Sequence, residues 1–476
     1  MHPSQCFRPA PVCRTAAFLA TLCLATSASA LMDYRPRLRP AARLAISEDP
    51  TQAKRSIDAL RAHGPDGLDA LMQEYGPDIQ RRLAQPAGRF TPDEEARWKR
   101  ISAAIDTVAA QKDAHASGLY WYTDLEQARA ASRASGRPIL SLRLLGTLDT
   151  DFSCANSRFF RTVLYPNAEV SRTLRDRYVL HWQSVRPVPK VTIDMGDGRV
   201  IQRTITGNSI HYVLDSAGRP VDAIPGLYGP GAFLRALGEA GRAVAKLNEL
   251  PDDSARRDYL ADWHVARLAA VDAAWERDLS QINGGAPTRA VARQSRGATA
   301  RKGSPTAAEA ATRATAKSAA EVPIVRVLDR GALTPRPAAA DEATWSRIAA
   351  LPTHAADARL DPSSRSLVVS KGPPAATAAP LTVTKLRVED PMVRLFASLQ
   401  RNVAEDTVRN EYTFHRTIHE WFATRQPETL QPSADPLNER VYADLFLTPS
   451  TDPWLGLAPR DAYSALDGDG IKASVR

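Results

Sequence analysis

Between residues 119 and 250, short apolar runs alternate with amphipathic stretches, and this alternation constrains the fold more than any other feature. Ile139–Leu145 (ILSLRLL) is an apolar run of the length of a buried strand, and helical stretches separate it from a second run, Tyr178–Val185. A third run, Ile210–Asp215, follows a hairpin signal at Gly196-Asp197-Gly198. This order predicts a mixed sheet with helices on its faces.

Helical patterns flank this region on both sides. Residues 31–118 carry apolar side chains at helical spacing, and Thr91 and Glu94 form a capping box that marks one helix start. Residues 251–282 continue the helical pattern. We therefore expect a helical N-terminal module, an α/β domain over 119–250, and a helical extension over 251–282.

The composition changes abruptly near residue 283. From 283 to 380 the chain consists largely of Ala, Arg, Lys, Ser, Thr, Pro and Gly, so burial cannot offset the entropy cost of ordering it. Hydrophobic patterning returns at Leu381. The sequence predicts a disordered, low-complexity basic linker over 283–380 and a mainly helical C-terminal module over 381–476. The fold class is then α+β and multidomain, and it stays open whether the C-terminal module folds alone or docks on the core.

The first 30 residues have the pattern of a secretory signal peptide. Two arginines precede a short apolar stretch, and Ala28-Ser29-Ala30 matches a cleavage site, so the mature chain is expected to begin near Leu31. Three of the four cysteines lie in this segment, which leaves Cys154 alone after cleavage. One cysteine cannot form an intramolecular disulfide, so packing must stabilise the mature chain. We expect an exported protein, periplasmic or extracellular.

Short motifs within residues 119–250 resemble those of exported members of the thioredoxin superfamily. Such modules begin W-x-x-D-L-x-x-A and continue G-K-P-I-L, and the matching stretches here start at Trp121 and Gly136. The family's redox pair, C-x-x-C at a helix start, is matched by C-x-x-S at Cys154–Ser157, and Ser209 occupies the position of the family's cis-proline. The resemblance implies a thioredoxin-like fold with a degenerate redox site.

The site that the resemblance implies consists of Cys154, Ser157, Ser209 and His211. Dithiol exchange needs a second thiolate to resolve the mixed disulfide, and Ser157 cannot supply one, so an ordinary disulfide reductase or oxidase is not expected. A thiol at a helix N-terminus can still become a reactive thiolate, which leaves monothiol chemistry open. The alternative is that Cys154 is a small buried hydrophobic residue.

His415 and His419 lie four residues apart in a predicted helix, a spacing that lets two side chains reach one metal ion. The neighbouring glutamate follows the second histidine instead of lying inside H-E-x-x-H, so zinc-protease chemistry is not expected. Packing against a neighbouring element is the favoured interpretation of the pair. Haem-attachment, P-loop and Rossmann motifs are absent from the sequence, and no cofactor is predicted.

The distribution of charge decides which partners to expect. The chain has 62 Lys and Arg residues against 53 Asp and Glu, a net charge of +9 that by itself suggests a nucleic-acid partner. Residues 1–30 contribute +2 and residues 281–340 contribute +7, so the remaining chain sums to zero. We therefore expect no nucleic-acid partner, and only weak, salt-screened contact of the linker with anionic surfaces. No apolar run is long enough to predict a transmembrane segment.

Two functional classes fit these features. The first is a binding or scaffolding module of the cell envelope whose partners are other proteins. The second is a monothiol thiol–disulfide exchange enzyme in which Cys154 attacks thiol-containing protein substrates, with Ser157, Ser209 and His211 shaping the site. Exposure of the Cys154 sulfur distinguishes the two, because exchange needs an accessible thiolate.

Overall fold

The structure is a computed structural model, and the residues that it describes are 35–84, 90–204, 207–284, 340–371 and 391–455. The predicted signal peptide over 1–30 lies outside these residues, as do the parts 285–339 and 372–380 of the predicted linker and the parts 381–390 and 456–476 of the predicted C-terminal module. Within the described part of the chain, no helix is both long enough and apolar enough to cross a membrane.

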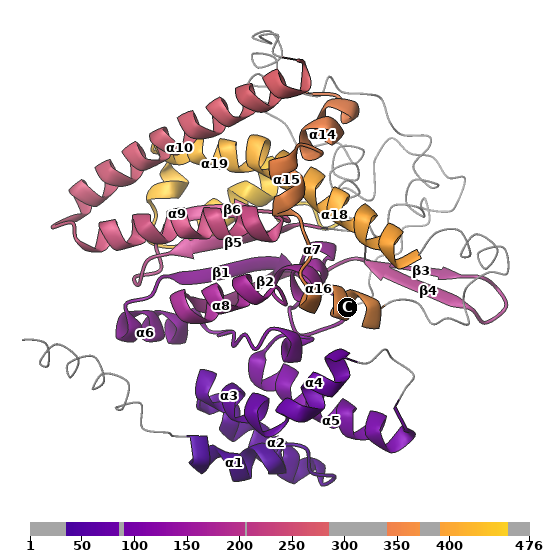
Figure 1. The fold of residues 1–476 in the computed structure, drawn as a ribbon. Helices are drawn as coiled ribbons and strands as arrows, with labels where there is room; N and C mark the ends of the chain where they lie inside the picture. Colours follow the sequence, from indigo (N-terminus) through magenta and orange to yellow (C-terminus); the bar gives the residue numbers. More distant parts are fainter. Residues whose placement is uncertain (1–34, 85–89, 205–206, 285–339, 372–390, 456–476) are drawn as a thin grey trace, which may run out of the picture.

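The N-terminal end of the described chain is helical and encloses a hydrophobic core of its own (Figure 1). Its helices are α1 (Arg35–Leu44), α2 (Pro50–Ala62), α3 (Pro65–Glu74), α4 (Gly76–Ala84) and α5 (Pro92–Ala109). Leu60, Leu71 and Ile105 have no exposed surface in this core. The capping box forms as the sequence predicts: Thr91 Oγ1 accepts the Glu94 backbone N–H, and the Glu94 carboxylate accepts the Thr91 N–H.

A four-stranded sheet with the order β2-β1-β5-β6 lies at the centre of the molecule (Figure 1). Its strands are β1 (Ile139–Leu145), β2 (Val179–Arg186), β5 (Ser209–Leu214) and β6 (Pro220–Pro225). β1 and β2 run parallel, β5 runs antiparallel to β1, and β6 runs antiparallel to β5. Every residue of β1, β5 and β6 is buried, which explains the nearly continuous apolar runs. The prediction of a mixed α/β fold is confirmed.

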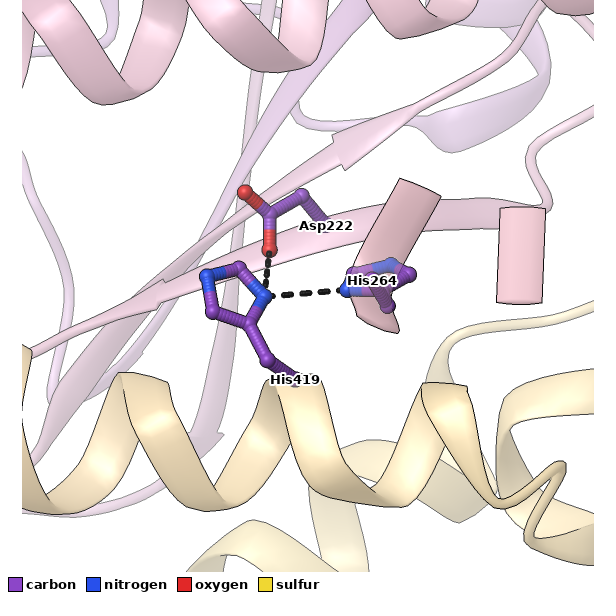
Figure 2. Close-up of side chains that lie close together, drawn as sticks. All are labelled: Asp222, His264 and His419. Carbon is purple, nitrogen blue, oxygen red and sulfur yellow. Dashed lines mark hydrogen bonds and ion pairs between the residues drawn. The ribbon is translucent and has the colours of Figure 1, made fainter. Parts of the chain in front are cut away.

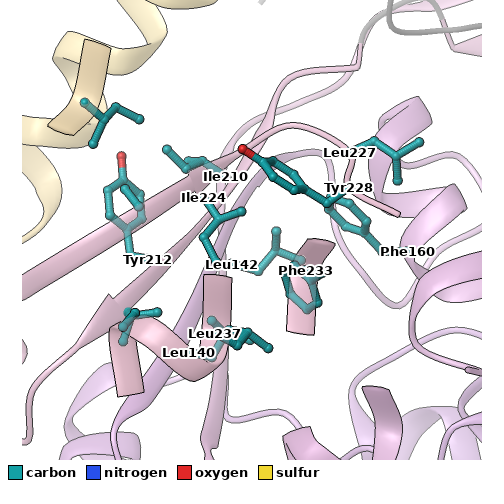
Figure 3. Close-up of a cluster of buried hydrophobic side chains, with 14 of the residues drawn as sticks. Leu140, Leu142, Phe160, Ile210, Tyr212, Ile224, Leu227, Tyr228, Phe233 and Leu237 are labelled. Atoms are coloured by element: carbon teal, nitrogen blue, oxygen red, sulfur yellow. The ribbon is translucent and has the colours of Figure 1, made fainter. Parts of the chain in front are cut away.

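Helices cover this sheet and complete its core. α6 (Leu125–Ser135) packs on β1 and β2, α8 (Ala168–Arg177) contacts β2, and α9 (Pro230–Asn248) packs on β5 and β6. Figure 3 shows side chains of strands, helices and loops meeting in one cluster. Its labelled residues are Leu140, Leu142, Phe160, Ile210, Tyr212, Ile224, Leu227, Tyr228, Phe233 and Leu237. Burial of each large apolar side chain of this kind contributes roughly 1.5–3 kcal/mol.

The predicted hairpin forms a separate two-stranded sheet that projects from the body of the molecule (Figure 1). β3 (Lys190–Asp194) and β4 (Val200–Thr204) pair in antiparallel register, with Ile193 opposite Ile201. The side chain of Val200 is 52% exposed, so the hairpin adds little to the core.

The predicted disorder of the linker is wrong for residues 340–371. Three helices form there: α14 (Glu342–Ala349), α15 (Pro352–Asp357) and α16 (Pro362–Ser370). Trp345 is buried, with its ring centroid 5.2 Å from that of Trp275, and Asp357 forms an ion pair with Arg235. The average composition of the whole segment is poor in large apolar residues, but a few such side chains suffice for a helix that packs on an existing core.

The described part of the C-terminal module packs into the same hydrophobic core as the sheet. It contains α18 (Pro391–Arg409), α19 (Arg416–Ala423) and α20 (Asp435–Arg440), with π-helical turns at 410–415 and 441–445. The long helix α10 (Asp253–Ile282) lies against α19, and Tyr212 on β5 donates a hydrogen bond to Asn438 Oδ1 at 3.3 Å. The module therefore docks on the core.

Candidate functional site

Cys154 ends the loop after β1 and lies at the N-cap of α7 (Ala155–Phe159). Its side chain has no exposed surface, and its backbone N–H donates to the Leu145 carbonyl at 3.2 Å. Burial raises the pKa of the Cys154 thiol, and hydrogen bonds from Ser157 oppose that effect only in part. The thiol is therefore protonated at neutral pH.

The two predicted serines do not form a redox pair with Cys154. The Ser157 hydroxyl donates to the Cys154 carbonyl at 2.9 Å, a bond within the first turn of α7. Ser209 begins β5 opposite Leu144 of β1, and its carbonyl accepts the Gly226 N–H at 2.8 Å. Its Oγ is buried and has no hydrogen-bond partner among the described residues.

His211 faces aromatic side chains instead of the thiol. Its Nε2 lies 2.8 Å from the Tyr165 hydroxyl, and its ring centroid lies 4.6 Å from that of Phe160 and 5.1 Å from that of Phe233. Burial lowers the pKa of His211 to about 3, so the imidazole is neutral at neutral pH. The partner of this histidine is Tyr165, so no Cys154–His211 pair forms.

The loop before β5 nevertheless touches the start of α7, so the predicted residues share one neighbourhood. The Asn156 side-chain amide donates to the Gly207 carbonyl, and Thr204 Oγ1 donates to the Ser153 carbonyl at 3.0 Å. The C-terminal segment closes this neighbourhood from another direction. Tyr442 donates its hydroxyl to the Asn208 carbonyl at 3.2 Å, and the Asn208 side chain donates to Thr448 Oγ1 at 3.0 Å.

A second cluster of polar side chains lies in the interior between β6, α10 and α19 (Figure 2). Asp222 comes from β6, His264 from α10 and His419 from α19, and each is at most 2% exposed. His264 Nδ1 lies 2.9 Å from His419 Nδ1, which in turn lies 3.8 Å from Asp222 Oδ1. One nitrogen or oxygen atom of each residue lies within 4.8 Å of the others.

Neighbouring groups fix how these side chains are oriented. His264 Nε2 donates to the Val221 carbonyl at 2.9 Å. His415 Nε2 lies 3.0 Å from Asp222 Oδ1, and His415 Nδ1 lies 3.4 Å from the Tyr228 hydroxyl. His415 therefore holds the carboxylate, but it does not belong to the group of three convergent atoms.

Burial and mutual contact determine the charges in the cluster. Burial by itself would raise the pKa of Asp222, but the nearby His415 reverses this and the pKa falls well below its usual range. Burial lowers the pKa of His264 to about 4. Burial, followed by the proximity of His415, lowers the pKa of His419 far below its usual range. The carboxylate is thus ionised at neutral pH, while His264 and His419 are neutral imidazoles, the form that binds metal ions.

A cavity of about 210 Å³ borders this cluster. Val221 and Phe422 line the cavity, and the Phe422 ring also stacks on His264 with centroids 4.2 Å apart. Two arginines in its wall, Arg219 and Arg256, each pair with Asp215 at 2.8 Å. Arg257, Arg425 and Asp253 also line the cavity.

The i, i+4 spacing of His415 and His419 pointed to one member of the convergent group, His419. It did not point to the other two members, Asp222 and His264. Asp222 carried a usable signal, because it is an acid inside an apolar strand that is buried along its whole length. His264 lies beside Trp263 in a helix of mixed composition and gave no comparable signal.

Comparisons of the chain with protein-family models, with curated proteins and with solved structures find no match.

Proposed function

We propose that this chain is an exported protein whose thioredoxin-like α/β core serves as a binding or scaffolding module for other envelope proteins. Three features support the thioredoxin-like part: a parallel β1–β2 pair, a helix that begins at Cys154 after β1, and Ser209 at the start of the antiparallel strand β5. The signal-peptide pattern over residues 1–30 supports export.

The burial of Cys154 is the observation that supports a structural rather than a catalytic role for this residue. Thiol exchange requires an attacking thiolate that reaches the substrate sulfur, and Cys154 has neither an exposed surface nor a lowered pKa. Ser157 supplies no second thiol, and Tyr165 takes the hydrogen bond of His211. These contacts favour the binding module over the monothiol enzyme.

Alkylation of the full chain after removal of residues 1–30 tests this proposal. In the folded protein, Cys154 should stay unmodified by iodoacetamide across pH 6–9, and it should react within minutes once urea unfolds the chain. A Ser135→Cys variant provides the matched control, because position 135 is exposed and its thiol should react at once in the folded state. Mass spectrometry of peptides assigns each modified thiol.

Partner capture completes the test. A scaffold should bind the same envelope proteins through the wild-type chain and through a Cys154→Ala variant, without any covalent adduct. Rapid alkylation of native Cys154, or partners that are retained only as mixed disulfides with Cys154, would establish the monothiol enzyme instead.

A further inference from the structure

We propose that Asp222, His264 and His419 bind one Zn²⁺ ion, which ties the C-terminal segment to the core of the protein. The inference goes beyond the proposed function and does not depend on it, because Cys154 takes no part in this cluster. Two nitrogens and one carboxylate oxygen are ligands that zinc accepts in proteins.

Hydrogen bonding already orients one ligand as a metal site requires. The Val221 carbonyl can only accept, so His264 carries its proton on Nε2 and directs the Nδ1 lone pair at His419. Metal-bound histidines generally donate their second ring N–H to a carbonyl or carboxylate in this way. Without metal, the 2.9 Å contact between the two Nδ1 atoms requires that His419 donate an Nδ1–H to His264.

The distances match the edges of a small coordination polyhedron. Ligands that lie about 2.0–2.1 Å from a tetrahedral zinc ion are separated from one another by roughly 3.3 Å. The separations of His419 Nδ1 from His264 Nδ1 and from Asp222 Oδ1 are 2.9 Å and 3.8 Å, on either side of that value. All three ligand atoms lie within 4.8 Å of one another, so modest movement of these side chains would bring them to such separations around one ion.

The charge of the cluster also favours a cation. Asp222 is 2% exposed, and its nearest described partners are imidazoles and the Ala223 N–H, which donates to Oδ1 at 2.8 Å. A buried carboxylate is costly unless it is paired with a positive group or bound to a metal. A zinc ion would add positive charge beside the carboxylate, next to His415, and would use the imidazole lone pairs of His264 and His419 as ligands.

The placement of the ligands indicates what the ion would do. The three residues belong to β6, α10 and α19, so one ion would join the sheet, the long helix and the C-terminal segment. Its binding free energy would add to the stability of the docked arrangement, because the unfolded chain has no preformed site.

Metal titration of the full chain, stripped with a chelator, tests the site. We expect one Zn²⁺ per chain after exhaustive dialysis, a higher thermal midpoint with Zn²⁺, and the visible absorption band of tetrahedral cobalt when Co²⁺ is added alone. Asp222→Asn, His264→Gln and His419→Gln should each weaken binding by more than the roughly 10–100-fold that loss of an outer partner costs. His415→Gln removes such an outer partner and should fall within that range with one site retained.

His211→Gln is the matched control, because His211 is equally buried but lies outside the cluster, and it should leave metal affinity unchanged. If a ligand variant fails to fold, nitrogen NMR of the wild-type chain decides. On addition of Zn²⁺, His419 should move its proton from Nδ1 to Nε2, while His264 keeps its proton on Nε2. Binding below one ion per chain, binding that survives His419→Gln, or an unchanged His419 tautomer would overturn the proposal.

Discussion

At the scale of single residues, Cys154 illustrates how burial removes chemistry from a reactive group. The start of a helix stabilises a thiolate through unpaired N–H groups and the positive end of the helix dipole. Here the helix α7 (Ala155–Phe159) continues as a π-helical segment over 160–164, but the thiol has no contact with solvent. Loss of hydration outweighs the helix terminus, so the pKa of Cys154 rises.

A pair of substitutions measures whether the Cys154 sulfur serves only for packing. Cys154→Ala leaves a small cavity and should lower the free energy of unfolding by about 1 kcal/mol. Cys154→Ser buries a hydroxyl and should cost a further ~1–3 kcal/mol if the hydroxyl finds no partner. Urea denaturation of both variants gives these values. Equal costs for the two variants would contradict a purely apolar role.

The residue scale also marks a limit of prediction from sequence. The i, i+4 spacing identified His415 and His419 because it is a local property of one helix. The convergent group instead joins His419 to Asp222 and His264, and the residues of its closest contact lie 155 positions apart. Asp222 could be singled out as an acid inside an apolar strand, but no local period reports which buried polar side chains will meet, so the meeting of the three residues could not be predicted.

At the scale of elements, aspartate side chains at the N-caps stabilise two of the helices within residues 340–371. Asp361 accepts the Ser364 N–H at 2.9 Å as the N-cap of α16, and it also accepts the Ala168 N–H at 2.8 Å at the start of α8. Asp341 caps α14 alone, through the Thr344 N–H at 2.7 Å. One aspartate therefore stabilises two elements and the other only one.

Substitution of the two aspartates by alanine should lower the stability of the protein by unequal amounts. Asp361→Ala should lower the free energy of unfolding by about 1–2 kcal/mol, because it leaves backbone N–H groups of two helices unpaired. Asp341→Ala should cost clearly less, since its position is exposed and serves one helix. Urea denaturation of both variants gives the comparison. A neutral Asp361→Ala would contradict a stabilising role for the hydrogen bond from the Ala168 N–H to Asp361.

The hairpin provides a second test at this scale. Val200 in β4 is 52% exposed, whereas Val213 in β5 has no exposed surface. Val200→Thr should change the free energy of unfolding by less than ~0.5 kcal/mol, while Val213→Thr should cost roughly 1–3 kcal/mol because it buries a hydroxyl. Thermal or urea unfolding of the two variants distinguishes these cases. Similar losses would show that the hairpin packs more tightly than its exposure indicates.

The helices and strands that were predicted correctly are those with a strong local sequence pattern. The strands of the sheet were predictable because both faces are covered and their sequences are nearly continuously apolar. The capping box at Thr91 was predictable because it depends on residues three apart. The helices α14 to α16 were not, because their apolar residues are few and gain stability only from a core formed elsewhere in the chain.

At the scale of the whole molecule, one hydrophobic core joins the sheet, α10, the helices at 340–371 and the C-terminal segment. Polar side chains are buried both in this body and in the N-terminal helical region, which has its own core. Burial lowers the pKa of His115 to about 4 and the pKa values of His181 and His211 to about 3. Burial acts in the opposite direction on Asp106 and raises its pKa to about 6.

These opposite shifts give opposite dependences of stability on pH. In the unfolded chain, each histidine has a pKa near 6.5. The native state, which holds the imidazoles neutral, is therefore most stable relative to the unfolded state above pH 6.5. This stability decreases as the pH falls toward the native pKa values, about 4 for His115 and about 3 for His181 and His211. Asp106 returns to a pKa near 3.9, so its contribution is complete below that value and is lost as pH rises through about 6. Between pH 5 and 6 the histidines therefore make stability rise with pH, while Asp106 opposes that rise.

Two substitutions should move this slope in opposite directions. Each proton that the unfolded chain binds in excess of the native chain contributes about 1.4 kcal/mol per pH unit. His181→Gln removes one such proton and should lower the slope between pH 5 and 6 by roughly 1 kcal/mol per pH unit, whereas Asp106→Asn should raise it by a similar amount. His63→Gln, at an exposed position, is the control for removing a histidine outside the buried core. Urea denaturation at several pH values measures the slopes. If His181→Gln has the same slope as the wild-type chain, the His181 imidazole is not held neutral in the native protein.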